Sequence, residues 1–345
     1  MKHILFITGT SYPCNSNMYM DTLASNLPSG YTASVVYADG GHRGIMQYLD
    51  IQDNVVTSLC HNAYREDWGA SVTEYIDEYA VDVVVTTSAY YSGNDVYSGI
   101  KTIHNMSEII DAAKSSPKVV FAALEFSGDV ASESKAVNAD VVITSSKQFA
   151  SLIDGCDVTP SIIYGGAYVP PIGKYVKDIR EYHGIPHETL VVGYIGELEN
   201  ENNVKPLVDA CRSVGARLLV AGYGKQSELI TDQKDMGYLT PIVPTNRRAW
   251  YDAFDVFVYP TKSLSFPFMA VEAMLCDTPV VMTPVSDFYS LTGGKFADFV
   301  YPTKEGIAEG IKKARQRRHI SDTKDFAEKK FSIETMVAGF IEVIK

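Results

Sequence analysis

The fold is decided by two stretches in the second half of the chain, YDAFDVFVYP at residues 251–260 and FPFMAVEAMLCDTPVV at residues 266–281. Each stretch joins a helical pattern to a short run rich in valine, phenylalanine or tyrosine. Helices that alternate with short apolar strands are typical of a parallel sheet, because parallel strands need long crossover connections. These residues therefore predict an α/β domain.

The same alternation extends outward in both directions. In the second half, strands are expected at Leu190–Ile195, Arg217–Ala221, Val256–Tyr259 and Pro279–Met282. In the first half, they are expected at His3–Thr8, Thr32–Ala38, Val81–Thr87, Lys118–Leu124, Asp140–Thr144 and Ser161–Tyr164. Residues 165–173 contain Pro170 and Pro171 and predict a linker. The chain thus predicts two doubly wound, Rossmann-like domains, residues 1–168 and 169–330, with ligands bound at the carboxyl ends of the strands and facing an interdomain cleft.

Composition excludes several classes of protein. The 345 residues are 46% hydrophobic and 21% charged, which is an ordinary globular balance. The net charge is −12, and residues 1–172 carry −11 of it, so the first half would repel a nucleic acid. Five cysteines form no C-x-x-C pair, and no apolar run is long enough to span a membrane. We therefore expect a cytoplasmic protein without disulfides or a zinc site.

Four common motifs are missing from the sequence. It contains no G-x-x-x-x-G-K-[ST], no G-x-G-x-x-G, no H-E-x-x-H and no G-x-S-x-G. These patterns mark P-loop nucleotidases, simple dinucleotide-binding dehydrogenases, zinc proteases and serine hydrolases. The two predicted domains therefore favour a different chemistry.

The two decisive stretches belong to a longer series that resembles the retaining glycosyltransferases of family four. The other segments are VVGYIGEL at 191–198, LLVAGYG at 218–224, FSIE at 331–334 and, less specifically, ADVVITSS at 139–146. The resemblance implies the two-domain GT-B architecture, in which the first domain binds an acceptor and the second binds a nucleotide diphosphate sugar. It also implies a C-terminal helix, at about residues 331–345, that packs back on the first domain.

The resemblance further implies a donor site. Glu272, at the beginning of a helix, is expected to accept hydrogen bonds from both ribose hydroxyls. The amides at the start of that helix suit a diphosphate, because N–H groups and the helix dipole attract anions. The other candidate donor-binding residues are Gly9, Thr10, Gly196, Lys225, Ser265, Phe266, Pro267 and Phe268.

Three positions depart from the family's pattern. Leu264 stands where the family has the first glutamate of its E-x7-E pair, which normally holds the transferred sugar. Glu197 and Asn202 stand where the family has an arginine and a lysine that neutralise the leaving diphosphate. Such charge stabilisation is often worth several kcal/mol. Contacts to the donor sugar and to the diphosphate are therefore expected to differ here.

Other cations could neutralise the diphosphate in this chain. Lys262 is the candidate catalytic cation, and Lys225, Arg247 and Arg248 are further candidates. The alternative is that Lys262 and Lys225 are ordinary surface residues without a role in binding. No histidine spacing suggests a metal site, although a divalent ion that bridges a carboxylate and the diphosphate stays an alternative.

The acceptor side has fewer signals. Glu125 follows a predicted strand of the first domain and could orient the acceptor hydroxyl or act as a general base. His42, Arg43 and Ser88 are the candidate acceptor-binding residues. A solvated loop is the alternative for His42 and Arg43.

Together these features predict a retaining glycosyltransferase that moves a sugar from a nucleotide diphosphate donor, with a UDP-sugar favoured, to a hydroxyl of a saccharide or glycolipid. No tightly bound cofactor is expected. Two alternatives stay open. One is a phage-type enzyme that modifies a hydroxylated DNA base, which the acidic first half disfavours. The other is a glycosyltransferase-like binding subunit without turnover.

Overall fold

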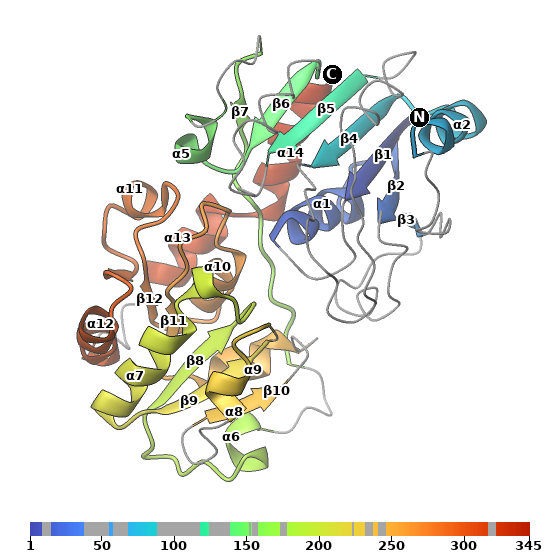
Figure 1. Ribbon diagram of the computed structural model, residues 1–345. Coiled ribbons are helices and arrows are strands. Elements are labelled where there is room, and N and C mark those ends of the chain that lie inside the picture. The colour runs from blue at the N-terminus through green and yellow to red at the C-terminus, as the bar shows by residue number, and fades with distance from the viewer. Residues whose placement is uncertain are drawn as a thin grey trace. The chain divides into compact units, whose positions relative to one another are not determined.

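The computed structural model describes residues 1–8, 15–37, 55–57, 68–87, 118–123, 139–151, 153, 158–172, 178–222, 224–231, 237–240, 246–316 and 322–345. The chain divides into two compact units. The first comprises Met1–Gly166, Leu264–Phe266 and Ile333–Lys345, and the second comprises Ala167–Ser263 and Pro267–Ser332. Each unit is built around a parallel sheet of its own (Figure 1).

The sheet of the first unit has the described strands in the order β3-β2-β1-β4-β5-β6-β7. These are β1 (Lys2–Thr8), β2 (Tyr31–Tyr37), β3 (Val55–Thr57), β4 (Val83–Thr87), β5 (Lys118–Ala123), β6 (Val141–Thr144) and β7 (Ser161–Ile162). The described helices are α1 (Asn15–Ser25), α2 (Trp68–Tyr79), α5 (Lys147–Ala150) and α14 (Ile333–Ile344). Helix α14, drawn in red in Figure 1, comes from the C-terminal end of the chain but packs within the first unit. The ring centroid of its Phe340 lies 5.9 Å from that of Phe6 in β1.

The sheet of the second unit has the order β10-β9-β8-β11-β12-β13. Its strands are β8 (Val191–Ile195), β9 (Arg217–Ala221), β10 (Gly237–Thr240), β11 (Val256–Tyr259), β12 (Val280–Met282) and β13 (Asp298–Phe299). Its helices are α6 (Ile179–Tyr182), η2 (Asn200–Asn202), α7 (Val204–Val214), α8 (Glu228–Thr231), α9 (Arg247–Ala253), α10 (Phe268–Leu275), α11 (Phe288–Thr292), α12 (Lys304–Gln316) and α13 (Asp322–Lys330). In both sheets the first strand lies beside the fourth, which is the strand order of a Rossmann-like domain.

The core of the second unit follows from its apolar strands. Every residue of β8 and β11 is buried, as expected for parallel strands covered on both faces. Helix α7 lays an apolar face that includes Val204, Leu207 and Cys211 into the same core. It ends at Gly215, whose φ of +66° is a left-handed conformation that glycine adopts without strain.

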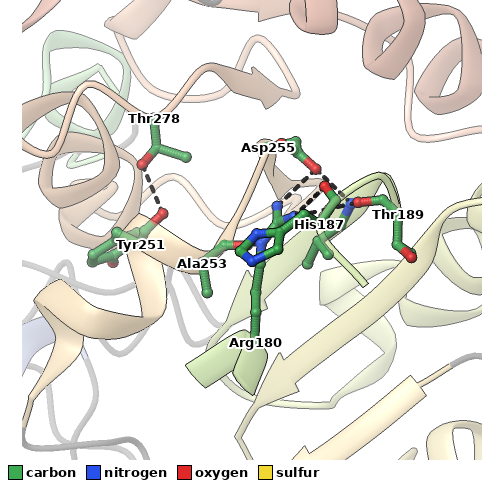
Figure 2. A network of polar contacts seen from close by, with 8 residues as sticks. Arg180, His187, Thr189, Tyr251, Ala253, Asp255 and Thr278 are labelled. Carbon is green, nitrogen blue, oxygen red and sulfur yellow. Dashed lines mark hydrogen bonds and ion pairs between the residues drawn. The ribbon is translucent and has the colours of Figure 1, made fainter. Parts of the chain in front are cut away.

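A buried ion pair joins several segments at the amino ends of β8 and β11. The Arg180 guanidinium donates to Asp255 Oδ2 at 2.8 Å and to the Ala253 carbonyl at 2.8 Å. Asp255 Oδ2 also accepts from the Val191 amide at 2.8 Å. Figure 2 shows Arg180 beneath Asp255, with the His187 and Thr189 carbonyls on the same guanidinium. This cluster fixes α6 to the two central strands of the sheet.

Replacement of Arg180 by methionine should destabilise the second unit. The Asp255 carboxylate would stay buried without its cation, and such a loss costs about 3 kcal/mol. Arg248→Met is the matched control, because Arg248 pairs with Asp252 at 2.8 Å on a half-exposed helix face, where a pair is worth less than about 1 kcal/mol. Urea unfolding measures both, and equal losses would contradict the assignment.

Candidate functional site

The second unit contains a topological switch point between β8 and β11. Chain connections run from β8 toward β9 and β10 on one side, and from β11 toward β12 and β13 on the other. All paired strands are parallel, so their carboxyl ends meet at one edge of the sheet. Open α/β sheets bind ligands at this edge, beside the switch point. The loops that follow β8, β9, β11 and β12 are therefore the candidate site.

Hydrogen bonds fasten three of these loops to one another. Asn203, after β8, has a left-handed φ of +50° and donates its Nδ2 to the Pro260 carbonyl after β11 at 2.6 Å. The Thr283 hydroxyl, after β12, donates to the Thr261 carbonyl. The Ser263 amide donates to Thr261 Oγ1 at 3.0 Å. The β11 loop is thus held from both sides without help from a ligand.

The glycines after β8 and β9 let two loops pack backbone against backbone. Gly196 has a φ of +150°, and its amide donates to the Ala221 carbonyl at 3.0 Å. A Cβ on Gly222 would lie 1.9 Å from the Gly196 carbonyl oxygen, and one on Gly224 would lie 2.5 Å from the Leu198 carbonyl oxygen. Gly196 therefore has a structural reason to be glycine, and its contact with a donor stays a prediction.

Tyr194 fixes the next residue of the β8 loop. Its hydroxyl donates to the Glu197 carbonyl at 2.5 Å. Burial raises the pKa of Tyr194 well above its usual value, so the hydroxyl keeps its proton and continues to donate. The backbone at Glu197, where the family has an arginine, is therefore held in place.

The two candidate lysines lie in different surroundings. Lys225 donates its amide to Glu199 Oε1 at 3.1 Å, and its Nζ lies 3.9 Å from Glu199 Oε2. Lys262 is exposed, directly after Thr261 on the braced β11 loop, and no described residue forms an ion pair with it. Lys262 is therefore the stronger candidate for an incoming anion.

Glu272 lies on α10 and is paired within the protein. The helix begins at Phe268, so Glu272 lies one turn inside it, rather than at its beginning as the sequence suggested. Glu272 is 1% exposed. Arg247 donates from Nη2 to Oε1 at 2.5 Å and from Nε to Oε2 at 2.6 Å. The Tyr251 hydroxyl donates to Oε2 at 3.0 Å and lies 3.1 Å from the Met269 carbonyl.

This geometry changes the expectation for the two arginines. Arg247 was a candidate for the diphosphate, but the residue is buried, with 7% of its surface exposed, and its guanidinium pairs with Glu272. Arg248 pairs with Asp252. The role of Tyr251 was missed, since a tyrosine within an apolar run gives no sign of its hydroxyl's partner. Thr278 donates to the Tyr251 carbonyl at 3.1 Å, a bond drawn in Figure 2, and so joins the segment between α10 and β12 to α9.

The turn before α10 is compact. Ser265, Phe266 and Phe268 are buried, and Pro267 is the N-cap residue. Proline has no amide hydrogen, so Pro267 itself offers no donor to a phosphate. The remaining amides of this turn stay candidates. The candidates Gly9, Thr10, His42, Arg43, Ser88 and Glu125 lie outside the described residues.

In the part of the chain that the structure describes, no group of three or more His, Cys, Asp or Glu side chains could hold a metal ion. None of the helices in that part is both long enough and apolar enough to cross a membrane.

Comparison with known proteins points to glycosyltransferases. Residues 189–316 match the family described as glycosyl transferases group 1. The D-inositol 3-phosphate glycosyltransferase of Corynebacterium jeikeium is 27% identical over 186 residues, which cover 46% of this chain and 44% of that protein. The chain therefore matches less than half the length of this curated relative.

Solved structures match over almost the whole chain. Sucrose-phosphate synthase from Thermosynechococcus elongatus has a TM-score of 0.75 at 15% identity, covering 99% of this chain and 98% of that one. HepE of Anabaena in complex with UDP has a TM-score of 0.74 at 16% identity, covering 99% of both chains. The chain has the GT-B fold. The predicted α/β class with two Rossmann-like domains is confirmed.

Proposed function

We propose that the protein is a retaining glycosyltransferase of the family-four type, with the donor site at the carboxyl edge of the second unit. The observation that carries this proposal is the placement of Glu272 on α10, the helix that follows the switch-point strand β11. The matched family and the similarity to a UDP-bound structure support a nucleotide diphosphate sugar as the donor, and we favour a UDP-sugar.

The reaction exchanges one bond for another at the anomeric carbon. The bond to the leaving phosphate oxygen breaks, and a bond to the acceptor oxygen forms on the same face of the sugar. The acceptor proton passes to the departing phosphate oxygen. Negative charge therefore grows on the diphosphate, and a nearby cation lowers the barrier because it acts where that charge develops.

Lys262 is the proposed cation. Its ammonium is exposed on a loop that Asn203 and Thr283 brace from both sides. A braced loop presents the charge with little ordering cost on binding. The first unit would supply the acceptor site, with Glu125, His42, Arg43 and Ser88 as the candidates there. A saccharide hydroxyl is the proposed acceptor.

Replacement of Lys262 by methionine should lower kcat roughly 100-fold, the usual effect of removing one group that stabilises developing negative charge. Lys313→Met is the matched control, since Lys313 is exposed and pairs with Glu309 at 2.5 Å on α12. It should retain the wild-type kcat within a few-fold. An unchanged kcat in the Lys262→Met protein would exclude Lys262 as the cation.

Donor turnover tests the proposed function directly. The protein is incubated with UDP-, GDP-, ADP-, CMP- and TDP-linked sugars, with and without Mg²⁺ and saccharide acceptors, and nucleotide release is measured. One donor class should release its nucleotide, and the product should keep the donor's anomeric configuration by NMR. An inverted product would exclude retention. Binding without release under every condition would favour the non-catalytic subunit.

A further inference from the structure

The Glu272 carboxylate has most of its acceptor positions filled. Oε1 accepts from Arg247 Nη2, while Oε2 accepts from both Arg247 Nε and the Tyr251 hydroxyl. A carboxylate offers about four acceptor positions. Donors from the described residues therefore occupy three of the four acceptor positions, and the position that remains is on Oε1.

Arg247 also controls the charge of this group. Its guanidinium and the carboxylate form a side-on, bidentate pair, a geometry that a planar fork achieves and a lysine ammonium does not. An unpaired carboxylate would repel a diphosphate nearby, and this chain has Glu197 and Asn202 where the family has cations. A neutralised carboxylate can still accept a hydrogen bond from an uncharged hydroxyl.

We propose that Arg247 is a positioning residue that fixes and neutralises the Glu272 carboxylate, so that Oε1 accepts one ribose hydroxyl of the nucleotide and no second one. This rests on the proposed function. Glu272 is 1% exposed in the free chain, so binding must uncover Oε1. The bidentate pair keeps the carboxylate oriented when Oε1 becomes exposed. The Glu272 side chain is therefore already ordered before the ligand binds, and binding does not have to order it.

A purely structural pair would join α9 to α10 without affecting the choice of nucleotide. The two roles separate in the selectivity for ribose over deoxyribose, which a general loss of stability does not change. Calorimetric titration of the full chain with UDP, 2′-deoxy-UDP and 3′-deoxy-UDP measures that selectivity, and another base replaces uracil if the donor assay selects it.

In the wild type, removal of one of the two hydroxyls should weaken binding roughly tenfold or more, because a buried hydrogen bond to the ion-paired Glu272 carboxylate is lost. Removal of the other should have little effect on the Glu272 contact and change affinity less than threefold. Equal, large losses with both analogues would overturn the single-acceptor proposal. This measurement needs no variant, so it stands even if an Arg247 variant fails to fold.

Arg247→Lys tests the positioning role, since it keeps the charge but loses the fork. The ratio between UDP and the sensitive deoxy analogue should fall to nearly one, while Arg248→Lys keeps the wild-type ratio. An unchanged ratio in a folded Arg247→Lys protein would show that Arg247 is only structural. Failure of the wild type to bind any nucleoside diphosphate would instead remove the proposed function itself, which is a different result.

Discussion

Arg247→Met should destabilise the second unit by about 3–5 kcal/mol, because it leaves the Glu272 carboxylate buried without its cation. Few single substitutions cost this much. Urea unfolding followed by tryptophan fluorescence measures it in a Trp68→Phe background. The remaining tryptophan, Trp250, is buried in α9 and so reports on the helix that carries Arg247.

The double variant Arg247→Met/Glu272→Met separates folding from function. Apolar residues of similar volume often replace a buried ion pair without loss of stability, so most of the stability should return. Nucleotide binding should not return, because no carboxylate is left to accept the ribose hydroxyl. A double variant as unstable as the single one would contradict the ion-pair explanation. A double variant that binds UDP normally would contradict the role of Glu272.

Gly222→Ala should be the most damaging single-methyl change in the described glycine loops. The new Cβ would lie 1.9 Å from the Gly196 carbonyl oxygen, which is backbone and cannot rotate away. The loops after β8 and β9 must then separate, at a cost of about 3 kcal/mol, the upper end for overpacking. Nucleotide binding should fall as well, since the same loops border the candidate site.

Gly339→Ala is the matched control for that change. Its Cβ would make ordinary contacts of 3.6 and 3.8 Å with Ile163, and Gly339 lies within helix α14. Alanine there should be neutral or stabilising by about 0.5–1 kcal/mol, because it reduces the conformational freedom of the unfolded chain. The unfolding midpoint of Gly222→Ala should therefore fall, while that of Gly339→Ala should stay the same or rise. A stable Gly222→Ala protein would mean that the two loops do not pack as described.

The central strands were predictable because their apolar runs are long and buried. The expected strand at Leu190–Ile195 corresponds to β8 at Val191–Ile195, and the expected strand at Arg217–Ala221 is β9. The edge strands β10 and β13 were missed, since they are short and contain glycine or aspartate. Helix α13 was missed because it has no apolar stripe, and Ala327 is its one buried residue among those described.

The candidate site was predictable only in part. The motif around Glu272 predicts that this residue lies on a helix after a strand. The apolar run at residues 256–259 predicts the strand, and Asp277-Thr278-Pro279 marks the end of the helix. Its pairing with Arg247 was not predictable. The two residues are 25 positions apart on different helices, and no periodicity relates them. Likewise, the packing of Gly222 on Gly196 depends on how two loops meet at the sheet edge, which local sequence does not encode.

The most direct test of the central claim is amide hydrogen exchange of the wild-type protein with and without UDP. At ten times its Kd, UDP should slow exchange about tenfold in amides that open only in the free protein. We expect this protection in peptides that cover residues 196–203, 224–226, 260–263 and 267–272, at the carboxyl edge of the second unit. Unchanged exchange with every nucleoside diphosphate, or protection confined to the first unit, would contradict the proposed donor site.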